Sequence, residues 1–178
     1  EDKLKPQSPY ALTKLKEEDY ILDLCKTKKL NATILRFGTI FGISPGMRFH
    51  TAVNKFCWQA SWGQPLTVWL TAFDQVRPYL DIEDASRALI HVINKNIFKG
   101  DIYNVLTFNA SVSDIIKEIK KYKSDLKINM VDSRIMNQLS YEVSTSKFKE
   151  TEFKYNGNLQ KGIKNTMNLL GCQTYEKY

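Results

Sequence analysis

The chain has few cysteines and no long apolar run, and each shortage excludes a class of protein. Its three cysteines, Cys25, Cys57 and Cys172, are widely spaced, odd in number and form no CxxC pair. This pattern argues against a disulfide framework and favours a reducing, cytoplasmic location. No apolar segment reaches the roughly 20 residues that a membrane helix needs, and no signal-like apolar stretch follows the opening EDKLK. We therefore expect a cytoplasmic protein without a membrane partner.

Histidine is also scarce, and basic charge is not concentrated. The two histidines, His50 and His91, have no neighbouring cluster of ligand residues, so we expect no metal site. The net charge is +7, and 21 of the 26 basic residues are lysines. Many of them alternate with acids, as in KLKEED, which is typical of a solvated helix face. Because basic runs with interleaved aromatic residues are missing, we expect no nucleic-acid partner.

Helical and strand patterns alternate along the chain. Ser8 before Pro9 is a usual helix start, and apolar periodicity carries this helix to about Lys29. The β-branched run at 32–37, bounded by Gly38, predicts a buried parallel strand. Further helices are expected at 49–61, at 83–95, from the capping-box spacing of Ser111 and Asp114, and at 159–170 before Gly171; further strands are expected at 65–69, 76–82, 101–106 and 127–131. The alternation predicts an α/β fold.

A tyrosine and a lysine lie four residues apart near the start of the first expected helix. Tyr10 and Lys14 therefore share one helix face, one turn apart. A cation beside a phenol favours the phenolate, which can take a proton from an alcohol while hydride leaves the same carbon. With nine tyrosines and 21 lysines, roughly one YxxxK arises by chance in this chain, so the pair gains meaning only from its context.

Four sequence blocks supply that context. SPYALTK, LRFGTIFG, VRPYLDIEDASRA and GDIYNV resemble, in order and approximate spacing, the extended short-chain dehydrogenase/reductase family, and above all its nucleotide-sugar epimerases and dehydratases. The resemblance spans nearly the whole chain. It implies the C-terminal part of a Rossmann domain, a doubly wound parallel sheet, at residues 1–42 and 76–106. Residues 43–75 and 107–178 are then expected to form a small α/β substrate-binding domain.

The resemblance implies which residues bind the cofactor, NAD or NADP. Tyr10 matches the family's catalytic base, which also contacts the cofactor, and Lys14 matches the lysine that holds the cofactor ribose. Phe37 and Thr39 match the block beside the nicotinamide. The glycine-rich cofactor loop is not in the sequence, since glycines 38, 42 and 46 are four apart and follow the wrong strand. We therefore expect the chain to be the C-terminal portion of a longer enzyme and to be inactive alone.

The resemblance also implies a site for a nucleotide-diphosphate sugar. Arg77 matches an arginine that contacts the diphosphate. The alternative interpretation of Arg77 is a surface ion pair. Thr39 and Asn54 match positions near the same diphosphate, although many members carry asparagine in place of Thr39. Val68 and Trp69 match a strand that packs on the nucleotide base, and core packing is an equal alternative for the tryptophan. Nearby, Asp84 is expected to have a structural role at a helix start.

The implied function is epimerisation of a nucleotide sugar by transient NAD-dependent oxidation through Tyr10 and Lys14. The alternatives are a sugar-nucleotide 4,6-dehydratase or another extended short-chain oxidoreductase, and a non-catalytic binding module that kept the fold. The sequence does not separate the first two, because the family's acid pair for water elimination lies upstream of these residues. The resemblance further implies a homodimer formed through the Tyr10 helix.

Overall fold

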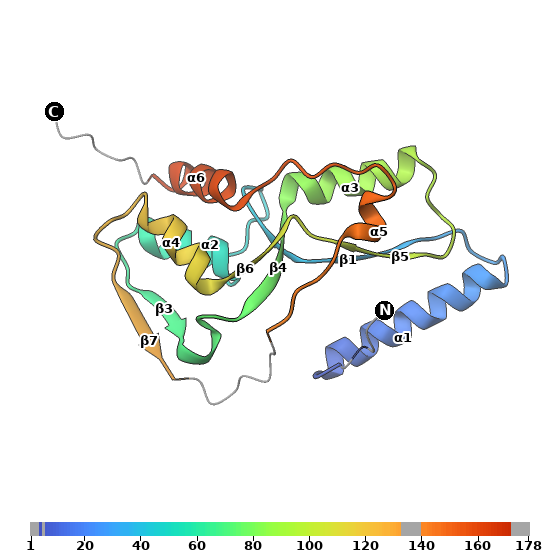
Figure 1. Cartoon of the computed structure of the whole chain (residues 1–178), viewed down its shortest axis with the longest axis horizontal. Coiled ribbons are helices and arrows are strands. Elements are labelled where there is room, and N and C mark those ends of the chain that lie inside the picture. Colours follow the sequence, from blue (N-terminus) through green and yellow to red (C-terminus); the bar gives the residue numbers. More distant parts are fainter. Residues whose placement is uncertain (1–3, 5, 133–139, 172–178) are drawn as a thin grey trace.

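The computed structural model describes residues 4, 6–132 and 140–171 and confirms the α/β class. The strands are β1 (Ile34–Phe37), β2 (Thr39–Phe41), β3 (Leu66–Trp69), β4 (Val76–Asp81), β5 (Ile102–Val105), β6 (Phe108–Ser111) and β7 (Ile128–Val131). The helices are α1 (Pro9–Lys26), α2 (Ala52–Ser61), α3 (Ile82–Asn94), α4 (Val112–Lys120), α5 (Ser146–Lys149) and α6 (Leu159–Leu169), with a 3-10 turn η1 at Leu70–Ala72. Figure 1 shows α2, α4 and α6 gathered at one end and α1 standing apart at the other.

The strands form three small sheets. β1 pairs with β5 and β3 pairs with β7, both in parallel. In the third sheet, β4 lies between β2, which is parallel to it, and β6, which is antiparallel. Parallel pairing joined by helices is the arrangement expected for alternating strands and helices.

The expected buried strand at 32–37 needs two corrections. The extended chain continues after Gly38 as β2 and changes its partner from β5 to β4. A side chain at Gly38 would meet the Pro78 carbonyl group at 3.1 Å, so glycine lets the chain pass close to β4 without crowding it. No residue of β1 is fully buried, because β5 is its one strand partner among the described residues.

Side-chain caps fix where the helices begin. Ser8 accepts a hydrogen bond from the Ala11 amide at the start of α1, as expected. Ser111 and Asp114 form the expected capping box of α4, with hydrogen bonds in both directions. Gly171 has a φ of +81° after α6, which confirms it as the residue that ends this helix. Helix α1 ends at Lys26, three residues earlier than expected.

Buried side chains form two clusters. The larger one joins β2, β3, β4, α2, α4 and α6 and includes Phe41, Leu66 and Ile163. The other joins α3, β4, β5 and α5 and includes Leu80, Val105 and Phe148. The expected division into a Rossmann part and a substrate domain stays a prediction.

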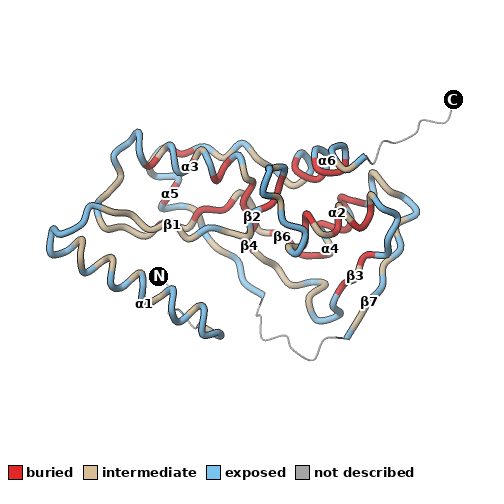
Figure 2. The backbone as a smooth tube through the Cα atoms, turned by 180° about the vertical axis from the view of Figure 1, so that it is seen from behind, coloured by how far each residue is buried: buried red, intermediate tan, exposed pale blue. Residues whose placement is uncertain are grey.

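Helix α1 is the least covered element of the fold. It has no buried residue, and the side chains of Leu12 and Tyr20 are exposed. Figure 2 shows the helix in the colours of exposed and intermediate residues along its whole length. A bidentate ion pair ties it to the sheet, since Arg36 of β1 donates from Nε and Nη2 to the two carboxylate oxygens of Glu18 at 2.8 and 2.5 Å. The homodimer expected through this helix stays a prediction.

The carboxylate of Asp84 joins three segments that are distant in the sequence. Its Oδ1 accepts hydrogen bonds from Arg87 Nη1 and from the Asn156 amide, both at 2.9 Å. Its Oδ2 accepts from Thr107 Oγ1 at 2.9 Å and from the Gly157 amide at 3.0 Å. The side chain is fully buried, and all four donors converge on it. The structural role expected for Asp84 is therefore confirmed, and it extends beyond its own helix.

Removing this carboxylate is expected to destabilise the chain strongly. Asp84→Ala removes the acceptor of Arg87 Nη1, Thr107 Oγ1 and the Asn156 and Gly157 amides, so the free energy of unfolding should fall by about 3–5 kcal/mol. Urea denaturation measures this change. Asp74→Ala is the matched control, because Asp74 is exposed, and it should change stability by less than about 0.5 kcal/mol. A loss below about 1 kcal/mol for Asp84→Ala would contradict this account.

Candidate functional site

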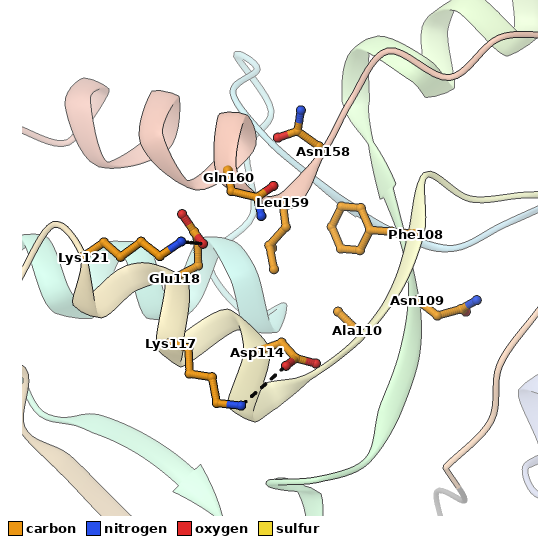
Figure 3. A pocket seen from close by; sticks show the side chains of 10 residues that line it. All are labelled: Phe108, Asn109, Ala110, Asp114, Lys117, Glu118, Lys121, Asn158, Leu159 and Gln160. Carbon is orange, nitrogen blue, oxygen red and sulfur yellow. Dashed lines mark hydrogen bonds and ion pairs between the residues drawn. The ribbon is translucent and has the colours of Figure 1, made fainter.

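The larger of two surface hollows is not built from the expected site residues. It has a volume of about 570 Å³ and lies between β6, α4 and the start of α6 (Figure 3). Its charged side chains are paired with one another: Lys121 Nζ lies 2.6 Å from Glu118 Oε2, and Lys117 Nζ lies 3.9 Å from Asp114 Oδ1. This hollow therefore offers no unpaired charge to a ligand.

The second hollow contains two of the expected substrate-binding residues. Its volume is about 400 Å³, and it is formed by β2, the loop that follows β2, and the start of α2. Thr39 and Asn54 both line it, together with Arg48, His50 and Ile82. Residues that are 15 positions apart in the sequence are thus brought to one concave surface. We take this hollow as the candidate site.

Asn54 holds the loop that forms the hollow. Its Oδ1 accepts a hydrogen bond from the Gly42 amide, and its Nδ2 donates to the Arg48 carbonyl oxygen, both at 3.1 Å. Gly42 has a φ of +110°, a backbone conformation that favours glycine. Asn54 is only 3% exposed, and both ends of its amide are engaged within the protein. Its expected contact with a diphosphate stays a prediction, whereas its role in closing the loop is direct.

Arg48 is a residue of the hollow that the sequence analysis missed. It is exposed, and its guanidinium forms no ion pair with any described residue. A planar guanidinium suits phosphate oxygens, which it can bind through two parallel hydrogen bonds. The sequence does contain a feature that could have identified Arg48. It is an arginine in a glycine-containing loop, in a chain whose basic residues are mostly lysines.

Tyr10 and Lys14 share a helix face as expected. Lys14 Nζ lies 5.8 Å from the centre of the Tyr10 ring. Lys14 also forms a 2.6 Å ion pair with Glu17, which raises the pKa of the lysine. Tyr10 is 73% exposed, and neither residue lines the hollow that contains Thr39 and Asn54. The structure therefore keeps the pair together and leaves it open to a ligand, but separate from that hollow.

Arg77 is held on β4 with part of its guanidinium unsatisfied. Nη2 donates to Gln75 Oε1 at 2.9 Å, and the guanidinium carbon lies 5.0 Å from the centre of the Tyr141 ring. Nη1 is buried and has no hydrogen-bond partner among the described residues. The alternative of a surface ion pair fails, because no described acid pairs with Arg77. An unsatisfied buried donor is the feature expected where a ligand anion binds.

The other expected residues differ in their access to a ligand. Val68 is 1% exposed and belongs to the core, so only its backbone can reach a ligand. Trp69 is 47% exposed at the end of β3, so core packing does not account for it. Phe37 is exposed at the end of β1. The contacts of all three with a nucleotide or a cofactor stay predictions.

Metal clusters and membrane-spanning helices are both absent from residues 4, 6–132 and 140–171. No three or more histidine, cysteine, aspartate or glutamate residues in this part are grouped so that they could hold a metal ion. No helix in this part has both the length and the apolarity required to cross a bilayer.

The Asn54 hydrogen bonds give a direct test of how the loop is built. Asn54→Ala removes both bonds and leaves the Gly42 amide without its acceptor, so stability should fall by about 1–3 kcal/mol. Hydrogen exchange at the Gly42 amide should accelerate by more than the global loss explains. Asn94→Ala, at an exposed position of α3, is the control and should leave Gly42 exchange unchanged. Unaltered Gly42 exchange in Asn54→Ala would refute the loop-closing role.

Comparison with known proteins finds a family model and relatives that resemble the chain. The model of the NAD dependent epimerase/dehydratase family matches residues 1–105. The chloroplastic UDP-sulfoquinovose synthase of Spinacia oleracea is 30% identical over 145 residues, which are 72% of this chain and 30% of that protein. A trifunctional UDP-glucose 4,6-dehydratase/UDP-4-keto-6-deoxy-D-glucose 3,5-epimerase/UDP-4-keto-L-rhamnose-reductase of Arabidopsis thaliana is 28% identical over 92% of this chain and 25% of that protein.

Solved structures share the fold. UDP-glucuronic acid 4-epimerase from Bacillus cereus, in complex with UDP-glucuronic acid and NAD, superposes with a TM-score of 0.81 at 24% identity, over 93% of this chain and 53% of that one. dTDP-glucose 4,6-dehydratase from Bacillus anthracis, in complex with NAD, gives a TM-score of 0.80 at 20% identity, over 94% and 53%. The chain thus spans about half of these solved chains and a smaller part of the curated relatives.

Proposed function

Because the chain belongs to the NAD dependent epimerase/dehydratase family, we propose that it supplies the proton-transferring tyrosine and the diphosphate-binding surface of a nucleotide-sugar epimerase. The observation that carries the proposal is the buried, unpartnered Nη1 of Arg77. A fixed guanidinium with a free donor matches a sugar-nucleotide diphosphate, which is rich in acceptor oxygens. The relatives named above act on UDP-sugars, which makes UDP the first nucleotide to test.

In this proposal the nucleotide is held by charge and by stacking. Arg77 binds the diphosphate. Arg48, which lines the candidate hollow together with Thr39 and forms no ion pair with a described residue, supplies a second cation there. The exposed indole of Trp69 offers a flat surface on which a nucleotide base can stack. Arginine suits this task better than lysine, since its rigid fork bonds two phosphate oxygens at once.

Tyr10 and Lys14 are assigned the proton chemistry. The phenol oxygen of Tyr10 takes the proton from the reacting sugar hydroxyl and returns it to the carbonyl oxygen when the sugar is reduced again. The Lys14 ammonium stabilises the phenolate, and its donors fit the paired hydroxyls of a cofactor ribose. NAD, the cofactor of this family, supplies the hydride acceptor when bound. The exposed helix face leaves both groups accessible for these contacts.

A 4,6-dehydratase is the second candidate. The specific observation in its favour is that a relative matching 92% of this chain carries that activity in its name. The same tyrosine and lysine serve both reactions, so their geometry does not distinguish them. The product does, because an epimerase returns an isomer of its substrate and a dehydratase returns a keto-sugar nucleotide with one water fewer.

Nucleotide binding tests the substrate assignment. We expect UDP, in calorimetric titrations of the chain alongside dTDP, GDP and CDP, to bind, and Arg77→Ala to weaken binding by about 1.5–3 kcal/mol, the contribution of a charged hydrogen bond. Lys117→Ala removes a cation from the larger hollow and should leave the affinity unchanged. Binding that is insensitive to Arg77→Ala, or equal sensitivity to both substitutions, would reject the proposed diphosphate site.

Turnover tests the role of Tyr10. The assay uses a longer enzyme that contains this chain together with a glycine-rich cofactor loop, because the chain is expected to be inactive alone. In its NAD-dependent conversion of a UDP-sugar, Tyr10→Phe removes the group that carries the proton and should lower kcat by about 10²- to 10⁴-fold. The dissociation constant of UDP should not change, since the diphosphate contacts lie elsewhere. Tyr20→Phe, on the same exposed helix, is the control and should keep full activity. Undiminished kcat in Tyr10→Phe would exclude the tyrosine as the proton acceptor, and UDP binding without any turnover by the longer enzyme would favour a non-catalytic binding module.

A further inference from the structure

A segment distant in sequence is fastened across β4 and β6. At one end, the Val76 amide donates to Ser140 Oγ at 3.0 Å and the Tyr141 amide donates to the Val76 carbonyl oxygen at 3.2 Å. At the other end, the Asn109 side chain exchanges two 3.1 Å hydrogen bonds with the backbone of Val143. We call residues 140–143 the strap; Figure 1 shows it rising beside β4 toward α5. Its backbone position is thus fixed relative to both strands.

The strap places an aromatic ring over Arg77. The guanidinium carbon lies 5.0 Å from the centre of the Tyr141 ring, within the range of a cation–π contact. Gln75 Oε1 accepts from Nη2, which fixes the rotation of the guanidinium plane. The ring and the amide together determine where Nη1 points, and Nη1 is the buried donor without a partner.

Within the described residues, no anion competes for the Arg77 guanidinium. None of the described acids forms an ion pair with Arg77. The phenol of Tyr79, two residues along β4, stays neutral, because burial raises its pKa to about 12. The guanidinium of Arg77 is therefore oriented, and no described acid neutralises its charge. Because its side chain is already ordered in the free protein, a ligand loses less binding free energy to ordering it.

We infer that Tyr141 is a positioning residue for the diphosphate of the nucleotide sugar: it acts through Arg77, holding the guanidinium so that Nη1 faces the ligand. The inference rests on the proposed function, since it assumes that Arg77 binds the diphosphate. It adds a residue from the far end of the chain to the site. In this inference the strap has a function, because its hydrogen bonds at Val76 and Val143 fix the position of the Tyr141 ring above β4.

The test is calorimetric titration of UDP into the chain and four variants. Tyr141→Leu removes the ring and should weaken UDP binding by about 3- to 30-fold, as expected for loss of a cation–π contact. Tyr141→Phe keeps the ring and should bind within about twofold of the unaltered chain. Arg77→Ala and the double variant Arg77→Ala/Tyr141→Leu should bind equally, since Tyr141 has no effect once the guanidinium is gone.

Hydrogen exchange at the Val76 amide shows whether the strap stays in place, because this amide donates to Ser140 Oγ. Protection should persist in Tyr141→Leu. Weakened binding together with lost Val76 protection would assign the effect to the strap as a whole and overturn the inference.

The remaining outcomes separate the two claims. A further loss of affinity in the double variant beyond Arg77→Ala would mean that Tyr141 touches the ligand itself, and would overturn a positioning role. Sensitivity to Arg77→Ala with none to Tyr141→Leu would reject the inference and leave the proposed function standing. Insensitivity to both substitutions would reject the proposed function, and the inference with it.

Discussion

The fold depends on one buried carboxylate. Asp84 receives hydrogen bonds from its own helix, from the turn after β5 and from the backbone just before α6, so it joins segments more than 70 residues apart. The approach is so close that a side chain at Gly157 would lie 2.6 Å from Asp81 Cβ. A carboxylate is suited to this position because it has acceptor capacity for four donors and needs no donor of its own. Neither a hydrophobic nor an amide side chain could replace it there.

The position of Arg77 depends on this junction. β4 carries Arg77 near its start and ends at Asp81, whose side chain caps α3 by accepting from the Glu83 amide. The strand is thus fixed at its end by the helix that Asp84 anchors, and along its length by β2 and β6. The strap then adds Tyr141 from the C-terminal side of the chain. The position of the Arg77 guanidinium is therefore a consequence of contacts made by residues on both sides of β4.

Local signals predicted much of this structure, and nonlocal contacts account for what they missed. Ser8, the capping box of α4 and Gly171 act within one helical turn, so the sequence located them. β6 was missed because FNAS is only four residues long, has no β-branched residue and contains an asparagine, which is depleted in strands, so it is a strand mainly by its pairing with β4. Tyr141 could not be linked to Arg77, since 64 residues separate them and the contact exists only after the strap is fastened. The same holds for the loop contacts of Asn54.

The arginines and the lysines differ in how their charge is compensated within the fold. Many lysines pair with acids on their own helices, as Lys14 does with Glu17 and Lys121 with Glu118, and such pairs contribute little beyond solubility. Among the described arginines, Arg36 and Arg87 bind carboxylates that hold the fold together, whereas Arg48 and Arg77 pair with none of the described acids. Arg48 lines a loop hollow, and Arg77, which does not line it, is oriented by an aromatic ring. Each guanidinium group is therefore suited to bind phosphate oxygens.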